Sequence, residues 1–159
     1  MAFSPSRRNV EIMLKKIPRN ITPELVKILM EMGHGDEIVL GDGNFPAANY
    51  AKRLVRCDGQ GVAGLLDAIL ELFPLDTYTE RPVILMEVAK GDDVQTPGIW
   101  GDYKKILQKH EPLASQIEYL GRYDFYNKAK EAYAIIATSE SEVYANIILR
   151  KGIVSPGGE

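Results

Sequence analysis

Cysteine and histidine are scarce in this sequence. Cys57 is the only cysteine among 159 residues, so no internal disulfide can form. The two histidines, His34 and His110, lie far apart in the chain with no cysteine pair beside them, so the ligand spacing of a structural zinc site is missing. A chain without disulfides suits a reducing compartment, and a cytoplasmic location is expected. Because no neighbouring group favours its thiolate, we interpret Cys57 as a partly buried packing residue.

Surplus positive charge and long apolar segments are also missing. Nineteen basic residues against 22 acidic ones give a net charge of −3, with the two signs interspersed. This balance does not supply the basic surface that binds nucleic acid, so no nucleic-acid partner is expected. No apolar run approaches the roughly 20 residues of a membrane span, and the first residues lack the apolar segment of a secretory signal.

Several catalytic signatures are absent as well. The glycines of the segment GDGNFP (41–46) lack the third glycine of a dinucleotide-binding loop. The chain contains neither the phosphate-binding G-x-x-x-x-G-K-[ST] sequence nor the nucleophile elbow G-x-S-x-G. Redox, phosphoryl-transfer, metal-hydrolase and serine-hydrolase chemistry are therefore not favoured.

The residues that are present predict an α/β protein. Hydrophobic residues make up 45% of the chain, enough for a continuous core. Residues 1–12 read as a polar tail or extension, and residues 13–159 as a single domain. Thr22 followed by proline predicts a helix start, and Gly33 a helix stop. Further helices are predicted over 59–73, 100–109 and 124–132, and strands over 38–40, 83–88, 117–120, 133–137 and 144–149. Such alternation favours helices layered on a sheet that is at least partly parallel.

His34 is the histidine better placed for proton transfer. It follows the helix that ends near Gly33, and an unperturbed imidazole titrates near pH ~6.5, so it can donate and accept protons at neutrality. Asp36 and Glu37 are expected to begin a strand at the surface, although either could orient the His34 ring. The alternative is a histidine that only complements the helix dipole. His110, at the end of another predicted helix between a lysine and a glutamate, is expected to be solvated.

Asp42 follows a buried strand and stands between two glycines. Ligands of open α/β sheets gather beyond the carboxyl ends of strands, and glycines allow the backbone to approach a ligand closely. An aspartate in a turn also commonly satisfies its own backbone, so binding and turn formation both remain open for Asp42.

The second half of the chain offers further polar candidates. Tyr144 and Asn146 pair a phenol with a carboxamide near an apolar strand, a combination of donors and acceptors that suits a polyhydroxylated ligand. Arg122 could hold ligand hydroxyls or form a surface salt bridge. Trp100 could offer an apolar face to a sugar, although core packing is its more ordinary role.

Five motifs in order resemble the family of D-ribose pyranases and L-fucose mutarotases (the RbsD/FucU family) over about 13–154. They are E-M-G-H-G-D-E-I (31–38), D-x-N-F-P (42–46), Q-T-P-x-x-W (95–100), R-Y-x-F-Y (122–126) and Y-A-N-I-I-L-R-K-G (144–152). The HGDE and NFP segments and the arginine before aromatic residues are closer to the fucose branch. Ala145 departs from it, because the fucose branch usually carries glycine at this position and the pyranase branch alanine.

The resemblance implies a three-layer α/β/α fold with a mixed, partly parallel sheet. It implies an enzyme without metal or cofactor that interconverts ring forms of a free monosaccharide, fucose above all, and a ring-shaped homo-oligomer with sites at subunit boundaries. Carried over by position, the acid/base histidine is His34 and the sugar-binding aspartate is Asp42. The binding arginine is Arg122, and the C-terminal binding segment comprises Tyr144, Ala145 and Asn146.

The hypothesis for the reaction is acid/base opening and closing of the sugar ring. His34 would protonate the ring oxygen, while Asp42 or the Tyr144 hydroxyl receives the anomeric proton. A strand separates His34 from Asp42, so loop geometry or a neighbouring subunit must bring them together. The alternatives are pyranose/furanose interconversion of D-ribose and a non-catalytic monosaccharide-binding module linked to transport.

Overall fold

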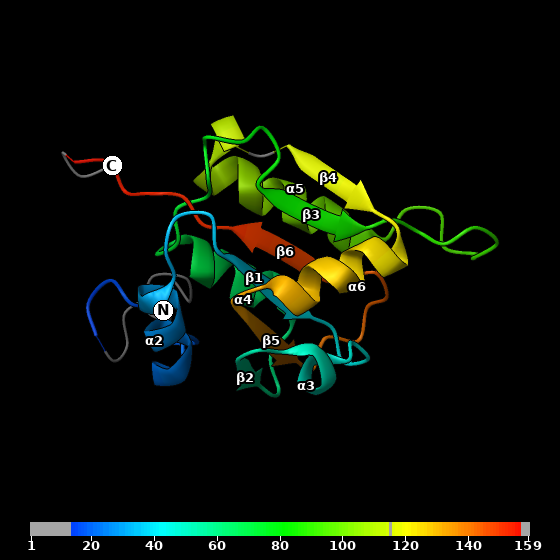
Figure 1. Cartoon of the computed structure of the whole chain (residues 1–159), viewed down its shortest axis with the longest axis horizontal. Coiled ribbons are helices and arrows are strands. Elements are labelled where there is room, and N and C mark those ends of the chain that lie inside the picture. Colours follow the sequence, from blue (N-terminus) through cyan, green and yellow to red (C-terminus); the bar gives the residue numbers. More distant parts are fainter. Residues whose placement is uncertain (1–13, 115, 157–159) are drawn as a thin grey trace, which may run out of the picture.

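The computed structural model describes residues 14–114 and 116–156, and the predicted tail, residues 1–12, lies outside them. One six-stranded sheet organises these residues (Figure 1). The strands are β1 (Glu37–Gly41), β2 (Leu54–Cys57), β3 (Val83–Met86), β4 (Ile117–Leu120), β5 (Ala134–Thr138) and β6 (Ile147–Arg150). The helices are α2 (Pro23–Glu31), α3 (Ala47–Tyr50), α4 (Val62–Leu70), α5 (Gly98–His110), the 3-10 helix η1 (Pro112–Ala114) and α6 (Arg122–Glu131).

Strand direction decides where the loops of the sheet gather. The strand order is β2-β5-β1-β6-β3-β4, and β6 runs antiparallel to both of its neighbours while the other pairings are parallel. In Figure 1, β3 and β4 point to the right and β6 points to the left. We call the end where β1 to β5 finish and β6 begins the carboxyl end of the sheet, and the opposite end the amino end. The mixed, partly parallel sheet expected from the sequence is confirmed.

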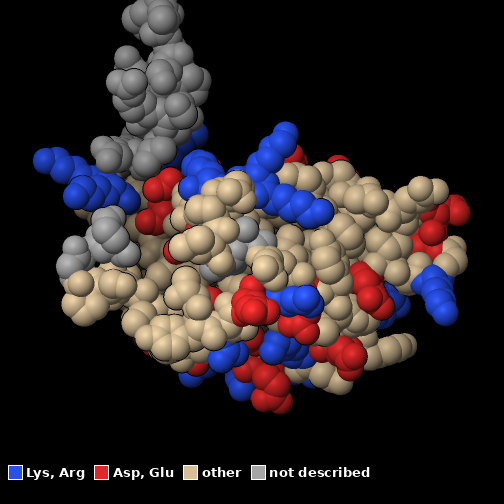
Figure 2. Space-filling model, turned by 90° about the horizontal axis from the view of Figure 1, so that it is seen from above, with Lys and Arg blue, Asp and Glu red and all other residues tan. Residues whose placement is uncertain are grey.

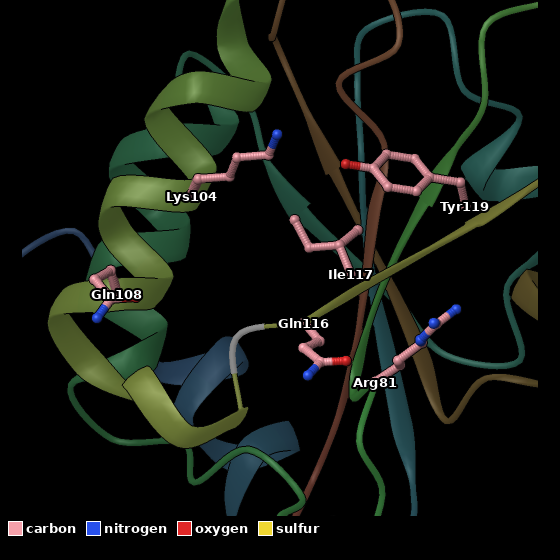
Figure 3. A pocket seen from close by; sticks show the side chains of 6 residues that line it. All are labelled: Arg81, Lys104, Gln108, Gln116, Ile117 and Tyr119. Atoms are coloured by element: carbon pink, nitrogen blue, oxygen red, sulfur yellow. The ribbon is translucent and has the colours of Figure 1, made fainter.

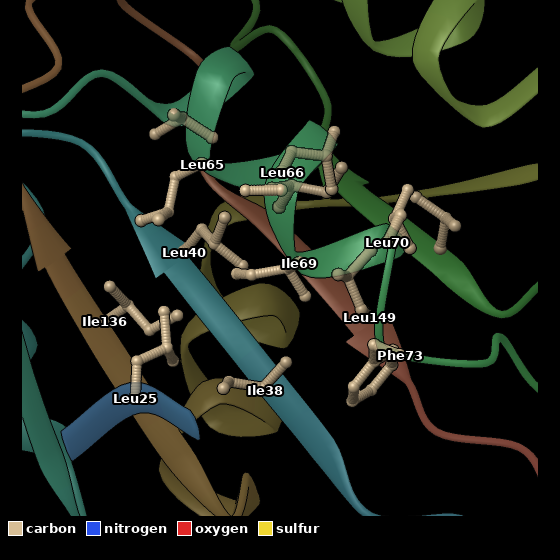
Figure 4. Packing of buried hydrophobic residues seen from close by; sticks show 14 of the residues in the cluster. Leu25, Ile38, Leu40, Leu65, Leu66, Ile69, Leu70, Phe73, Ile136 and Leu149 are labelled. Carbon is tan, nitrogen blue, oxygen red and sulfur yellow. The ribbon is translucent and has the colours of Figure 1, made fainter. Parts of the chain in front are cut away.

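Helices cover both faces of the sheet. In Figure 1, α6 crosses in front of the strands, while α4 and α5 lie behind them. Alternate residues of β1 supply the two cores: Ile38 and Leu40 pack with α2, α4 and α5, whereas Val39 packs with Phe125 of α6. Figure 4 shows the larger core, in which leucine and isoleucine side chains of α4 lie over β1 and β6. The expected three-layer α/β/α arrangement is therefore confirmed.

Local sequence accounts for most element boundaries. The Thr22 hydroxyl accepts a hydrogen bond from the backbone N–H of Leu25 at 3.1 Å, which confirms the predicted helix start. Two short elements, α3 and β2, were not predicted, because four residues are too few to show a period. The prediction of a strand from residue 144 was wrong at its start, because Tyr144 has a left-handed backbone (φ 58°) and β6 begins only at Ile147.

The surface carries both signs of charge. On the face in Figure 2, acidic and basic side chains alternate around uncharged areas, and neither sign forms a continuous field. Among the described residues, no helix combines the length and the apolar character needed to cross a membrane.

Candidate active site

A cavity of about 230 Å³ opens at the carboxyl end of the sheet. It lies where β1 ends, β6 begins, α6 starts and the loop after β3 passes. Four of the five predicted binding residues line it: Asp42, Arg122, Tyr144 and Asn146. The remaining lining residues are Asn44, Phe45, Met86, Asp92, Val94, Tyr126 and Val143. Because β6 is antiparallel, segments distant in sequence meet at this one place.

Asp42 and Asn146 are joined directly across the floor of the cavity. The backbone N–H of Asp42 donates to Oδ1 of Asn146 at 2.7 Å, and both residues are buried. One carboxylate oxygen of Asp42 accepts from the N–H of Asn44 at 2.9 Å, so turn formation and a binding position coexist in this residue. Burial raises the pKa of Asp42, with the charge of Glu140 adding to the effect, although the N–H groups of Asn44 and Phe45 oppose it. Asp42 is thus a more basic carboxylate than an exposed one.

The glycine before Asp42 serves packing. A Cβ on Gly41 would lie 2.9 Å from Cβ of Phe45, so a side chain here would collide with that residue. The sequence-based interpretation, that the glycine lets a ligand approach, is therefore unnecessary at this position. Gly41 instead allows the 42–46 turn to fold back so that Phe45 reaches the cavity wall and packs edge-on against Tyr126, with ring centroids 5.7 Å apart.

Tyr144 anchors the loop that follows β3. Its hydroxyl donates to Oδ2 of Asp92 at 2.6 Å and accepts from the N–H of Ala89 at 3.1 Å. The hydrogen bond to Asp92 raises the pKa of the Tyr144 phenol, which therefore keeps its proton at neutral pH. A proton-accepting role of Tyr144 is not favoured by this arrangement, whereas a role in shaping the cavity is.

Ala145 does not line the cavity. It is fully buried, and its carbonyl accepts a hydrogen bond from the Tyr103 hydroxyl at 2.6 Å. The neighbouring carbonyl, of Tyr144, accepts from the indole N–H of Trp100 at 2.8 Å. Ala145 can therefore contribute to the site only by carrying Tyr144 and Asn146, and Trp100 belongs to the core.

Arg122 begins α6 with its side chain exposed at the cavity rim. The salt bridge weighed as its alternative role is not formed with any described residue, although its charge lowers the pKa of Asp92 after the larger effects of hydrogen bonds from Tyr144 and Val94. Sequence reasoning did not select Tyr126, which lies one helical turn after Arg122 and lines the same cavity. The R-Y-x-F-Y spacing held the signal, since residues four apart share a helix face.

His34 lies at the other end of the molecule, just before β1. Its Nε2 is 3.0 Å from Oδ1 of Asp76, and the side chain is 40% exposed. The Tyr78 ring packs edge-on at 4.9 Å between centroids. Neither Asp36 nor Glu37 orients His34: Asp36 accepts from the N–H of Gly33, and Glu37 pairs with basic residues. The favoured interpretation, that the two acidic residues begin a strand, is supported, because β1 starts at Glu37.

Asp76 is the orienting carboxylate, and sequence reasoning missed it. The Oδ1 atom that faces His34 also accepts from the N–H of Tyr78 at 3.0 Å, and the other oxygen, Oδ2, accepts from Nε of Arg150 at 2.9 Å. Burial opposes its ionisation, yet the hydrogen bonds from Tyr78, His34 and Arg150 outweigh this and lower the pKa of Asp76. Asp76 approaches β6 because Gly152 has no side chain: a Cβ there would be 2.5 Å from the carbonyl oxygen of Leu75.

Within one chain, His34 and Asp42 do not meet. They stand before and after β1, whose five residues span roughly 17 Å at ~3.3 Å per residue. His34 is accordingly not among the residues that line the cavity at the carboxyl end. Loop geometry does not bring the two together, which leaves a neighbouring subunit as the remaining route.

The side chain of His110 is largely shielded from solvent, against expectation. Only 9% of its side chain is exposed, and its Nε2 lies 2.7 Å from Oδ1 of Asp67 on α4. The pair joins the end of α5 to α4, and this packing explains why the solvated interpretation was wrong. Among the described residues, Asp67, Glu71 and His110 form a group with a metal-binding composition, their ligand atoms within 4.8 Å of one another. The ammonium of Lys109 already contacts the Asp67 oxygen at 2.9 Å, which disfavours a cation there.

A second hollow lies between α5 and the outer strand β4 (Figure 3). Its volume is about 610 Å³. Lys104 and Tyr119 face one another across it, and Arg81 stands at its rim (Figure 3). None of the described residues that line it is a histidine or a carboxylate, the side chains most often used for proton transfer. The smaller cavity at the carboxyl end is the better candidate for chemistry.

Comparisons with known proteins agree on one family. Residues 15–154 match the model of the RbsD / FucU transport protein family. A fucose mutarotase from Homo sapiens is 43% identical over 150 residues, which cover 91% of this chain and 96% of the relative. An L-fucose mutarotase from Actinobacillus pleuropneumoniae is 43% identical over 141 residues, with 89% and 97% covered.

Solved structures lead to the same group. A fucose mutarotase from Streptococcus pneumoniae, in complex with L-fucose, superposes with a TM-score of 0.85 at 54% identity, covering 89% of this chain and all of that one. RbsD of Bacillus subtilis, complexed with D-ribose, gives a TM-score of 0.64 at 25% identity, covering 85% and 95%. Both measures are higher for the fucose enzyme than for the ribose protein.

Proposed function

The chain belongs to the RbsD / FucU transport protein family, and on that premise we propose that it is a fucose mutarotase, an isomerase that interconverts the α and β anomers of free L-fucose. The observation that carries the proposal is the meeting of Asp42, Arg122 and Asn146 around one cavity. These residues come from three segments, and each is the position to which the family resemblance assigns sugar binding.

The lining of the cavity suits a 6-deoxy sugar. Carboxylate, guanidinium and carboxamide groups offer acceptors and donors for ring hydroxyls. Met86, Val94 and Val143 add apolar surface that can receive a methyl group but cannot hydrogen-bond a hydroxymethyl group. L-Fucose presents hydroxyls on its ring and a methyl group at C6, and thus matches both parts of the lining.

Asp42 is proposed as the proton acceptor. Its buried carboxylate has a raised pKa, which makes it a better base toward the anomeric hydroxyl than an exposed carboxylate. As the proton leaves this hydroxyl, the bond between C1 and the ring oxygen breaks and the ring oxygen takes up a proton, giving the open aldehyde. Rotation about the C1–C2 bond and closure by the reverse steps yield the other anomer.

The proton for the ring oxygen is assigned to His34 of the partner subunit. Support comes from the position of His34 at the amino end of the sheet, away from the cavity of its own chain but largely accessible. In a ring-shaped homo-oligomer that joins the amino end of one subunit to the carboxyl end of the next, every cavity would receive an imidazole. Asp76 would hold Nε2, so Nδ1 would face the sugar.

The test is magnetisation-exchange NMR on L-fucose at anomeric equilibrium. We expect catalytic amounts of the protein to accelerate exchange between the two anomeric protons, and to do so more strongly for L-fucose than for L-galactose or D-ribose. Equal rates with and without protein for all three sugars would overturn the proposal.

A second candidate is pyranose/furanose interconversion of D-ribose, favoured by Ala145 and by the likeness to RbsD of Bacillus subtilis. The same assay decides between them, because that activity predicts faster exchange for ribose than for fucose. A non-catalytic binding module would bind sugar without accelerating either reaction. A cytoplasmic location is part of the proposal, and the free, buried Cys57 thiol agrees with it.

A further inference from the structure

We propose that Trp100 and Tyr103 of α5 are positioning residues that hold the sugar-binding corner, residues 144–146, in its binding conformation. Neither side chain lines the cavity. Both lie behind it, in the core between α5 and the sheet. The inference rests on the proposed function for what the corner binds, but the geometry of the corner is independent of the ligand.

Two side-chain hydrogen bonds connect α5 to successive carbonyls of the corner. The indole N–H of Trp100 donates to the carbonyl oxygen of Tyr144 at 2.8 Å, and the Tyr103 hydroxyl donates to that of Ala145 at 2.6 Å. Trp100 and Tyr103 are three residues apart and so share one face of α5. Both donor side chains are buried. If either were removed, water would not replace its hydrogen bond to the carbonyl with one of equal strength.

The corner needs such support because its backbone is unusual. Tyr144 is a non-glycine residue with φ 58°, a conformation that persists only when surrounding contacts impose it. Two residues later, Oδ1 of Asn146 accepts the N–H of Asp42 at 2.7 Å. A rotation of the corner would therefore displace Asn146 and break its connection to Asp42 together.

Charge links Tyr103 to the same place. The largest cause that raises the pKa of Tyr103 is burial, followed by the negative charges of Glu140 and Asp42. This environment favours the neutral phenol, whose O–H donates a hydrogen bond to the carbonyl oxygen of Ala145. Tyr103 therefore acts as a permanent donor that takes no part in proton transfer.

This role also accounts for the Q-T-P-x-x-W segment (95–100), which supplies no residue to the cavity. Pro97 precedes the first residue of α5, and its carbonyl accepts the N–H of Trp100 at 3.1 Å in the first helical turn. The segment thus starts the helix three residues before Trp100 and fixes which face carries the indole. The segment therefore places the indole N–H of Trp100 where it donates to the corner.

The test compares Tyr103→Phe with Leu107→Val in the full chain. Leu107 is equally buried one turn further along α5 but makes no hydrogen bond to the corner, so its variant controls for loss of packing. Two readouts are measured at 25 °C: the Kd for L-fucose by calorimetry and the hydrogen-exchange rate of the Asp42 amide by NMR.

We expect Tyr103→Phe to weaken L-fucose binding about five- to tenfold, the worth of one net hydrogen bond, and to speed exchange of the Asp42 amide by a similar factor. Leu107→Val should lower the melting temperature while changing both readouts less than about twofold. Trp100→Phe, which removes the other donor, should resemble Tyr103→Phe.

Unchanged Kd and unchanged Asp42 exchange in both Tyr103→Phe and Trp100→Phe would overturn the inference. Equal changes in Leu107→Val would do the same, because they would show a general effect of packing. If the wild type binds no L-fucose, the proposed function fails, and the Asp42 amide still decides whether α5 holds the corner.

Discussion

The two ends of the sheet use the same kind of residue for opposite purposes. At the carboxyl end, the carboxylate of Asp42 is buried beside a cavity, and its pKa is raised. At the amino end, the carboxylate of Asp76 is buried against Arg150 and His34, and its pKa is lowered. Partners decide the sign, since burial alone raises the pKa of both. One aspartate is suited to take up a proton, and the other to remain charged and hold a proton donor in place.

The division also separates binding from proton donation. Arg122 and Asn146 accompany Asp42 at the carboxyl end, where hydroxyl groups can be held. His34 at the amino end has a fixed orientation but is not among the residues that line this cavity. Each end is half of the proposed site, so a single copy of the chain is expected to be inactive, and contact between copies to create the enzyme.

The largest expected effect comes from disabling each half in a separate chain. His34→Ala should reduce fucose exchange by about 10²- to 10⁴-fold, because it removes the proton donor. Asn146→Ala should also reduce it, because the change removes a binding group and the acceptor that holds the Asp42 N–H. When the two variants are co-expressed and assemble at random, about a quarter of the sites should regain both groups and the same fraction of the wild-type rate. Exchange NMR on the purified mixture measures this recovery.

A second mixture serves as the control for this experiment. Combining His34→Ala with Asp76→Ala, two changes at the same end, should restore no activity above the single variants. A mixture of His34→Ala and Asn146→Ala that stays as inactive as its parents would show that both groups serve a site within one chain.

A large effect on rate without loss of stability is expected for Asp42→Asn. The change removes the proton acceptor, so exchange should fall by at least about 10²-fold. Since the folded state holds the Asp42 proton to higher pH than the unfolded state, wild-type stability falls as pH rises through that window. Asparagine does not titrate and can still accept from Asn44, so the variant should be at least as stable as the wild type at pH 7 in thermal denaturation.

Asp76→Asn should behave in the opposite way. The lowered pKa of Asp76 means that its stabilising contribution is complete above the unfolded-state pKa, near ~3.9, and is lost as pH falls through the lower folded value. The variant should lose about 2 kcal/mol at pH 7, since Arg150 loses the nearer of its two carboxylate partners, and its stability should depend less on acid. Urea denaturation curves recorded at intervals of about one pH unit, from roughly pH 2 to pH 7, measure the stability loss at pH 7 and the dependence of stability on acid. A variant as stable as the wild type at pH 7 would contradict the assignment.

The smallest effect concerns selectivity. Val94→Thr and Val143→Thr keep the shape of each side chain but place a hydroxyl on the apolar wall of the cavity. We expect the preference for L-fucose over L-galactose, measured as a ratio of kcat/KM, to fall by about three- to tenfold in the double variant. An unchanged ratio would show that the methyl group of fucose lies elsewhere. Leu113→Thr, at an exposed position on η1, serves as the control.

Patterns among neighbouring residues predicted the helices and strands of the α/β/α layers. They did not predict which side chains from distant segments come into contact. Thr22 and the stripe of α4 gave correct helices, because capping and periodicity are properties of neighbouring residues. Residue chemistry made Asp42, Arg122 and Asn146 candidates, and the family resemblance assigned them to sugar binding. Their common cavity depends on the direction of β6, which no local pattern encodes. Asp76 was missed because its partners are also distant in sequence. It lies 42 residues from His34, and only the pairing of β6 with β1 and β3 brings Arg150 beside Asp76.

The antiparallel course of β6 gives this short strand a mechanical role. Asn146 precedes it and Arg150 ends it, roughly 13 Å away at ~3.3 Å per residue. A slip of one residue would misplace both side chains at once, and it would move Ile147 and Ile148 each into the core on the opposite face of the sheet. In a closed ring of subunits, the four residues of β6 would separate the end of the sheet that serves one catalytic centre from the end that serves the next. The distance between neighbouring centres would then be set by the length of this single strand.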